Sequence, residues 1–217
     1  SSEIYGDPDP AAIPTPETYR GIVSCTGPRA CYDESKRLGE TLCVTFWQQF
    51  GTPVKIIRPF NVYGPGQRLD DKRIIPDLLS AALQRQPIVL HSDGRATRSF
   101  CYATDFLSGM LHVLMSNESG EAFNVGNDEE VTIRQVAEVA SRLDASGALP
   151  IEFRVSGDSQ YLVDNPQRRC PDLSKMRQAF PWQPCVPVAE GLARAYRSYL
   201  AETSVPSPHR HLQGAGV

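Results

Sequence analysis

The sequence predicts an α/β fold with parallel strands, and three observations support this. Short segments rich in β-branched residues alternate along the chain with segments whose apolar residues recur at helical spacing. The 217 residues, 41% of them hydrophobic, suffice for one ordinary domain or two small ones. The apolar runs are all shorter than the roughly eighteen residues that a membrane span requires. We therefore expect a soluble α/β protein.

The predicted elements of the first half follow from local patterns. Residues 1–6, SSEIYG, are typical of the end of a strand followed by a turn. Leu38, Leu42, Phe46 and Phe50 recur every four residues, which predicts a helix over 32–50 that ends at the Gly-Thr-Pro after it. A strand, a helix and a second strand are then expected over 54–57, 75–84 and 87–90.

The second half continues the alternation. Asp105 is expected to cap a helix that runs to Met115, and Thr132 with Gln135 is expected to form a capping box for a helix that runs to Leu143. Asp172 is expected to cap a short helix that ends near Phe180. The remaining expected elements are strands over 122–125 and 151–155, an amphipathic helix over 188–200 and a disordered tail over 201–217.

Charge and targeting signals exclude several classes of protein. The chain has 22 basic and 25 acidic residues, a net charge of −3, and no basic run, so we expect no nucleic-acid partner. The first ten residues have neither the basic nor the apolar region of a signal peptide, and we expect a cytoplasmic protein without a membrane anchor.

The six cysteines lack the spacing of a metal or redox site. They contain no C-x-x-C pair, and two of the four histidines lie near the C-terminus. We therefore expect no metal, and reduced thiols that are mostly buried.

Tyr32 and Lys36 form the first pattern that indicates chemistry. Their spacing of four residues places both side chains on one face of the predicted helix, about one turn apart. A phenol with an ordinary pKa of about 10 is a poor base at neutral pH, but a nearby ammonium group favours the phenolate. The pair is therefore a candidate general acid/base, with an ordinary exposed pair as the alternative.

The motifs around this pair resemble the extended short-chain dehydrogenase/reductase family, which modifies nucleotide sugars. They are SSEIYGDP, GPRACYDESKRLGET, RPFNVYGPGQR, TRSFCYATD, FNVGN and QRRCPDLSK, in that order. The resemblance implies the C-terminal part of an extended Rossmann-type fold, a doubly wound parallel sheet, interleaved over residues 1–200 with a small sugar-nucleotide-binding subdomain.

Within that family, GPRACYDESKR and PQRRCPD most resemble the UDP-glucuronate decarboxylases, which form UDP-xylose. The implied reaction is NAD-dependent oxidation at C4 followed by loss of CO2. Ser35 departs from the pattern, because these decarboxylases usually carry Gly there. The implied partners are a UDP-sugar substrate and a second copy of the chain, with the Leu38 to Phe50 stripe either in the core or in the dimer interface.

The resemblance also implies roles for site residues. Tyr32 would take the proton from the sugar O4, while Lys36 would bind the nicotinamide ribose. Ser1 and Ser2 would hydrogen-bond the C4 oxygen, and Glu3 would assist at C5 by protonation. Arg169 would hold the substrate carboxylate, unless it merely pairs with Asp172, and Glu3 could equally be a solvated turn residue. The residues expected to bind the nucleotide are Asn61, Arg68 and Arg98.

One expected motif is missing. The family's G-x-x-G-x-x-G turn, which holds the cofactor pyrophosphate, does not occur in these 217 residues. The chain is then a fragment of a longer enzyme, a subunit that needs a partner chain, or a non-catalytic binding module. A 4-epimerase or a 4,6-dehydratase would use the same Tyr and Lys, although Ser2 stands where dehydratases tend to carry Asp.

Overall fold

The computed structural model describes residues 1–154 and 167–204, and its strands pair mostly in parallel, as the sequence predicts. The parallel pairs are β1 (Ile56–Pro59) with β6 (Ala122–Val125), β2 (Val62–Tyr63) with β5 (Cys101–Tyr102), and β3 (Ile88–Leu90) with β8 (Ile151–Phe153). The last sheet places β4 (Thr97–Ser99) between β9 (Arg168–Arg169), which is parallel to it, and β7 (Glu130–Thr132), which is antiparallel.

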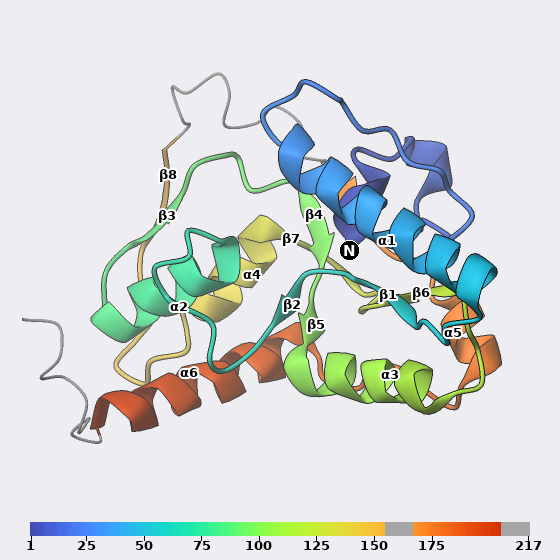
Figure 1. Ribbon diagram of the computed structural model, residues 1–217. Helices are drawn as coiled ribbons and strands as arrows, with labels where there is room; N and C mark the ends of the chain where they lie inside the picture. Colours follow the sequence, from blue (N-terminus) through green and yellow to red (C-terminus); the bar gives the residue numbers. More distant parts are fainter. Residues whose placement is uncertain (155–166, 205–217) are drawn as a thin grey trace, which may run out of the picture.

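The helices form two groups around these strands (Figure 1). α1 and α3 lie on opposite sides of β1 and β6, while α2, α4 and α6 pack together at the other end of the molecule. The α-helices are α1 (Ala30–Phe50), α2 (Ile74–Gln84), α3 (Ala103–Met115), α4 (Ile133–Ala140), α5 (Ser174–Ala179) and α6 (Val188–Ser204). Two short 3-10 helices, η1 (Ser2–Tyr5) and η2 (Pro10–Ala12), precede them.

Several predicted boundaries are confirmed by their caps. α1 ends at Phe50 and is capped by Gly51, whose left-handed φ of 66° is accessible to glycine at little cost and whose N–H donates to the Trp47 carbonyl. Thr132 and Gln135 form the predicted capping box of α4, although the helix ends at Ala140 and not at Leu143. The predicted strand over 54–57 lies two residues later in the structure, as β1.

Other predictions are wrong. Residues 2–5 form η1 and not a strand, because the Ser1 side chain accepts the Glu3 N–H and closes a 3-10 turn. Asp105 lies inside α3 and does not cap it, because its carboxylate accepts the backbone N–H groups of Cys185 and Val186. Residues 201–204 continue α6, whereas the rest of the predicted tail and Val155 lie outside the described residues.

The core consists of three clusters of buried side chains. The largest joins α2, α4 and α6 to β3 through residues such as Leu78, Leu90 and Leu192. A second joins β6 to α3 and α5 through Phe123, Val113 and Met176. The smallest places Tyr5 against Phe60 just after β1. Burial of these side chains stabilises each layer by about 1.5–3 kcal/mol per large residue.

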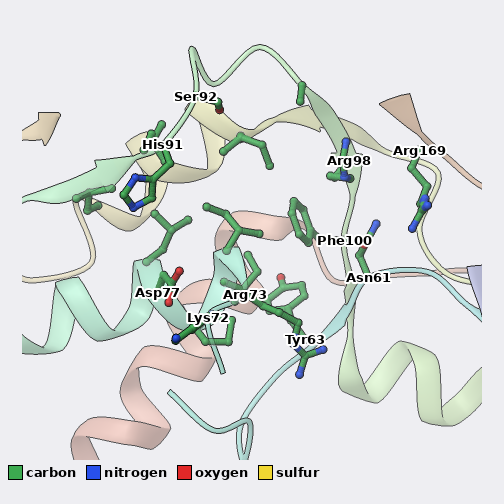
Figure 2. Close-up of a pocket in the computed structure, with 18 of the residues that line it drawn as sticks. Asn61, Tyr63, Lys72, Arg73, Asp77, His91, Ser92, Arg98, Phe100 and Arg169 are labelled. Atoms are coloured by element: carbon green, nitrogen blue, oxygen red, sulfur yellow. The ribbon is translucent and has the colours of Figure 1, made fainter. Parts of the chain in front are cut away.

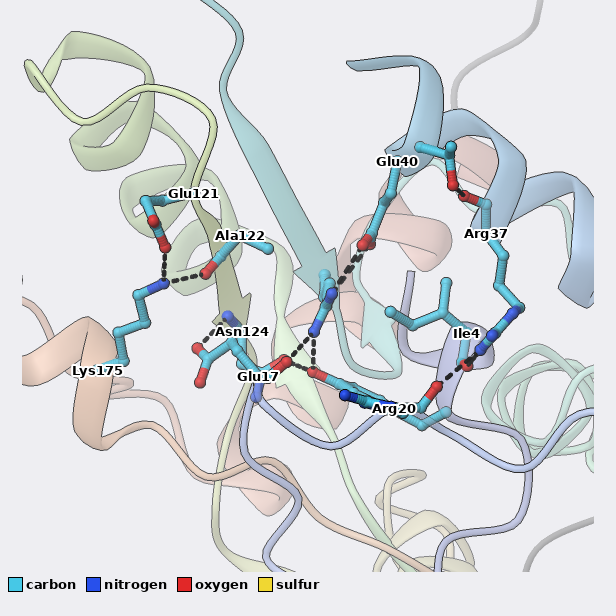
Figure 3. A network of polar contacts seen from close by, with 12 residues as sticks. Ile4, Glu17, Arg20, Arg37, Glu40, Glu121, Ala122, Asn124 and Lys175 are labelled. Carbon is cyan, nitrogen blue, oxygen red and sulfur yellow. Dashed lines mark hydrogen bonds and ion pairs between the residues drawn. The ribbon is translucent and has the colours of Figure 1, made fainter. Parts of the chain in front are cut away.

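A partly buried polar network joins α1 to the strands (Figure 3). Arg58 of β1 donates to Glu40 of α1, to the Tyr5 hydroxyl at 2.7 Å and to the Glu17 carbonyl at 2.9 Å. The Tyr5 hydroxyl in turn donates to Asn124 of β6 at 2.8 Å. Burial, offset only in part by Arg58, raises the pKa of Tyr5 to about 12, so the phenol is neutral.

The apolar stripe of α1 lies outside the core. Leu38, Leu42, Phe46 and Phe50 are 50–67% exposed, which excludes the first of their two predicted locations, the core, and the second, a dimer interface, stays a prediction. The thiols are all unpaired, but only Cys101 and Cys170 are buried, so the prediction of mostly buried thiols is also wrong. Within the described ranges, each helix is too short or too polar to cross a membrane.

Candidate active site

A cavity of about 850 Å³ lies between β4 and α2, within the size range of small-molecule sites. Figure 2 shows Asn61, Arg98 and Arg169 at one end of it, and Lys72, Asp77 and His91 at the other. Glu3 and Arg29 also line the cavity. Four of the sequence-predicted residues, Glu3, Asn61, Arg98 and Arg169, therefore surround one space.

Strand pairing places two arginines opposite each other at this end. Arg98 of β4 and Arg169 of β9 are register partners in the parallel pair. Burial first, and the charge of Arg169 second, lower the pKa of Arg98 to about 10. The Arg98 guanidinium thus stays cationic at neutral pH, and this end of the cavity is suited to an anion.

Asn61 lies beside them on the connection between β1 and β2. Its φ of 40° is in the left-handed region, which Asn tolerates better than most residues. The side-chain amide donates to the Ser99 carbonyl at 2.9 Å, and this bond fixes its direction at the cavity wall. Asn61 thus lines the cavity, and its predicted contact with the nucleotide stays a prediction.

Glu3 of η1 lies between two arginines. Its Oε2 accepts from Arg29 Nη2 at 2.6 Å, and its Oε1 accepts from Arg169 Nη1. Burial alone would raise the pKa of the Glu3 carboxyl, but the charges and hydrogen bonds of Arg169 and Arg29 outweigh it and hold the pKa below its usual value. Glu3 is therefore an ionised cavity residue and not a solvated turn residue.

Arg169 does not form the ion pair with Asp172 that was its alternative interpretation. Its Nη2 donates to the Gly6 carbonyl at 2.9 Å, and its side chain is 6% exposed. Asp172 instead accepts the Ser174 N–H at 2.8 Å. Arg169 is thus held by residues near the N-terminus and not by Asp172.

Tyr32 and Lys36 lie near the start of α1, one turn apart as predicted. The Lys36 ammonium lies 5.2 Å from the centroid of the Tyr32 ring, and Tyr32 is 47% exposed. Neither residue lines the cavity wall, although Arg29, which does, lies 5.9 Å from the same ring. The pair faces open space next to the basic end of the cavity.

The two serines lie where η1 begins. The Ser1 hydroxyl accepts the Glu3 N–H at 3.3 Å, and Ser2 is 3% exposed. Ser1 thus fixes the backbone that carries Glu3. Their predicted bonds to a sugar oxygen stay predictions.

Arg68 is not brought to the cavity. Its side chain is 82% exposed and forms an ion pair with Asp70 two residues later. Ser35 also points elsewhere, because its hydroxyl donates to the Tyr32 carbonyl at 2.7 Å. The substitution at Ser35 therefore changes a contact within α1 and not the cavity wall.

Sequence reasoning missed several cavity residues. Arg29 precedes Tyr32 by three residues, and this helical spacing could have indicated a shared face. The others come from loops, strands and α2 that meet only in the folded chain, and they include Tyr63, Lys72, Arg73, Asp77 and His91.

The predicted cofactor contacts are accessible. Tyr32 and Lys36 are both exposed on α1, and their contact with a nicotinamide ribose stays a prediction. For the pyrophosphate, the 217 residues contain no G-x-x-G-x-x-G turn, so they supply no cradle of that kind.

Comparison with known proteins identifies relatives. Residues 1–126 match the model of the "NAD dependent epimerase/dehydratase family". UDP-glucuronic acid decarboxylase 1 of Xenopus tropicalis is 37% identical over 202 residues, which cover 93% of this chain and 46% of the relative. UDP-glucuronic acid decarboxylase 3 of Arabidopsis thaliana is 35% identical, and the alignment covers 95% of this chain and 58% of the relative.

A solved structure is also similar to this chain in fold. The UDP-glucuronic acid 4-epimerase of Bacillus cereus, in complex with UDP-glucuronic acid and NAD, superposes with a TM-score of 0.74 at 26% identity, covering 93% of this chain and 60% of that one. The chain spans about half the length of the curated relatives it matches.

Proposed function

The chain belongs to the NAD dependent epimerase/dehydratase family, and from that premise we propose that it carries the sugar-nucleotide site of an enzyme that converts UDP-glucuronate to UDP-xylose. The observation that supports this choice is the end of the cavity where Glu3, Arg29 and Arg169 meet. The guanidinium groups of Arg29 and Arg169 can hydrogen-bond the carboxylate of a uronate sugar, whereas a neutral hexose has no anionic group for them to bind.

The reaction needs a base at the sugar O4. Tyr32 takes that proton, with Lys36 beside its ring. NAD, if bound by this pair, would accept the C4 hydride and return it to C4 after CO2 is lost, so that the conversion to UDP-xylose involves no net oxidation. The resulting 4-keto group lies β to the C5 carboxylate, so the electrons released with CO2 pass into an enolate.

The basic residues serve the second half of the reaction. Arg169 holds the carboxylate and offsets the negative charge that develops as CO2 leaves. Ser1 and Ser2 donate to the C4 oxygen. Because Glu3 is ionised between its arginines, it must first gain a proton before it can protonate C5.

Asn61 and Arg98 bind the nucleotide part of the substrate, at the wall of the same cavity. We do not include Arg68 among the nucleotide-binding residues, because its side chain is exposed and pairs with Asp70. We retain the homodimer as a proposal, with the exposed stripe of α1 as its contact surface.

A second candidate is a UDP-glucuronate 4-epimerase, which the similarity to the Bacillus cereus structure favours. It shares the substrate and the oxidation at C4, and differs in keeping the carboxylate. Product analysis separates the two reactions. The full-length protein, supplied with NAD+ and UDP-glucuronate, is expected to release CO2 and form a UDP-pentose, as measured by mass spectrometry. A product of unchanged mass would favour the epimerase, and loss of water from a neutral hexose nucleotide would favour a dehydratase.

A further inference from the structure

The carboxylate of Glu3 is bound as a substrate carboxylate would be. Each of its oxygens accepts a hydrogen bond from a different guanidinium, Oε2 from Arg29 at 2.6 Å and Oε1 from Arg169. All three residues line the cavity. The Glu3 carboxylate of the protein itself thus occupies the anion site that Arg29 and Arg169 form.

The two arginines retain further binding capacity. The Nε atoms of Arg29 and Arg169 are both buried and make no hydrogen bond to any described residue. A buried donor left unsatisfied costs about 1–3 kcal/mol, so a rearrangement of the two side chains on ligand binding that gave these atoms an acceptor would be favoured. The charge balance also favours an incoming anion, because Arg98 interacts with two further guanidiniums, of Arg29 and Arg169, and with two carboxylates, of Glu3 and Asp7, which gives three cations against two anions.

The two arginines differ in how firmly they are held. The side chain of Arg169 is 6% exposed, and its Nη2 is tied to the Gly6 carbonyl. The side chain of Arg29 is 41% exposed and stands at the N-terminus of α1. Exchange of partners therefore costs less at Arg29 than at Arg169.

We propose that Glu3 occupies the place of a substrate carboxylate on Arg29, and that a carboxylate-bearing sugar nucleotide displaces it on binding. The proposal rests on the proposed function, since it assumes a uronate substrate. It makes Arg29 a specificity residue, because a neutral hexose has no group that competes with Glu3. It also links binding of the substrate carboxylate to the proposed base, Tyr32, because Arg29 lies three residues before Tyr32 and close to its ring.

The test is a comparison of two ligands that differ only in the carboxylate. UDP-glucuronate and UDP-glucose are titrated calorimetrically into full-length protein with NAD+, in a Tyr32→Phe background so that the ligand is not consumed. Glu3→Gln and Glu3→Ala remove the competing charge, and we expect UDP-glucuronate to bind roughly threefold tighter. Arg29→Met is expected to weaken UDP-glucuronate about tenfold. UDP-glucose should change less than about twofold in every variant.

Glu130→Gln is the matched control, since Glu130 also pairs with an arginine, Arg168, but lies outside the cavity wall. It should leave both affinities unchanged. The proposal is overturned if the Glu3 variants bind UDP-glucuronate no more tightly, if Arg29→Met weakens both ligands equally, or if neither ligand binds. Absence of CO2 release with the unmutated protein would reject the proposed reaction alone, because the binding comparison does not depend on turnover.

Discussion

Arg58 of β1 binds the Glu40 carboxylate of α1 through two nitrogens of its guanidinium group. Nη2 donates to Oε2 at 2.7 Å, and Nε lies 3.0 and 3.2 Å from the two carboxylate oxygens. The side chains are only 11% and 19% exposed. Glu40 follows Lys36 by one helical turn and Tyr32 by two, so this ion pair fixes the helix that carries the proposed base against the sheet.

Loss of one partner of this pair should destabilise the protein strongly. Arg58→Met leaves the Glu40 charge, which is largely shielded from solvent, without this partner, and we expect the free energy of unfolding to fall by about 3 kcal/mol in denaturant titrations. The double variant with Glu40→Leu should recover part of that loss. Arg134→Met is the control, because its pair with Glu138 is exposed and should contribute less than about 1 kcal/mol. Equal losses in the two single variants would contradict the structural role of Arg58.

The stability of the protein should depend on pH through Glu3. Its pKa is lower in the folded chain than the usual 4.5, because Arg169 and Arg29 outweigh the effect of burial. A depressed pKa means that the carboxylate stabilises the fold above its unfolded pKa, and that this contribution is lost as the pH falls through the folded value. The difference in unfolding free energy between the wild type and Glu3→Gln should thus be constant near neutral pH and shrink in acid.

Denaturant titrations at a series of pH values measure this difference. Glu121→Gln removes a surface carboxylate paired with Lys175, and its effect should be smaller, since exposed pairs contribute little. A Glu3→Gln difference that stayed constant down to strongly acidic pH would show that the arginines do not lower the pKa of Glu3.

Local patterns predicted the parts of the site that lie within one helix. The spacing of Tyr32 and Lys36 is enough to place them together, because residues four apart on a helix share a face. The same holds for the α4 capping box, in which Thr132 and Gln135 are three residues apart. Prediction succeeded where the interacting groups are close in sequence.

The rest depends on tertiary contacts that no local pattern encodes. Glu3 and Arg169 are 166 residues apart in sequence, and they meet because β9 pairs with β4 beside η1. The helical spacing of the α1 stripe predicts a common face for Leu38 to Phe50, but not whether that face is buried. Arg68 resembles a nucleotide-binding position, yet its neighbour Asp70 pairs with it at the surface.

The phenol of Tyr32 should be essential for turnover. Tyr32→Phe keeps the ring beside Lys36 but removes the group that accepts the O4 proton. We expect kcat on UDP-glucuronate to fall more than tenfold, which corresponds to more than about 1.4 kcal/mol of transition-state stabilisation, while substrate affinity changes little. Tyr19→Phe, in the loop before α1, serves as the control. Retention of more than a tenth of the wild-type kcat would assign the base to another group.

The final prediction separates the two halves of the reaction at Arg169. Its guanidinium bonds Glu3 through Nη1 and the Gly6 carbonyl through Nη2. Arg169→Lys keeps the positive charge but cannot reproduce a planar fork with separate donors, so it cannot hold a carboxylate in two places. Oxidation at C4 relies on Tyr32, which Arg169 does not touch in the contacts described, whereas loss of CO2 relies on the charge that Arg169 offsets.

Arg169→Lys should therefore slow CO2 release more than oxidation, and the 4-keto sugar nucleotide should accumulate together with reduced cofactor. Single-turnover absorbance measures oxidation, trapped CO2 measures decarboxylation, and we expect the ratio of the two rates to change by about tenfold. Arg168→Lys is a close control, because the neighbouring residue is 43% exposed and pairs with Glu130 away from the cavity. If both rates fell by the same factor in Arg169→Lys, the residue would hold η1 in place and would have no separate role in decarboxylation, since a purely structural loss affects every step that needs the same fold.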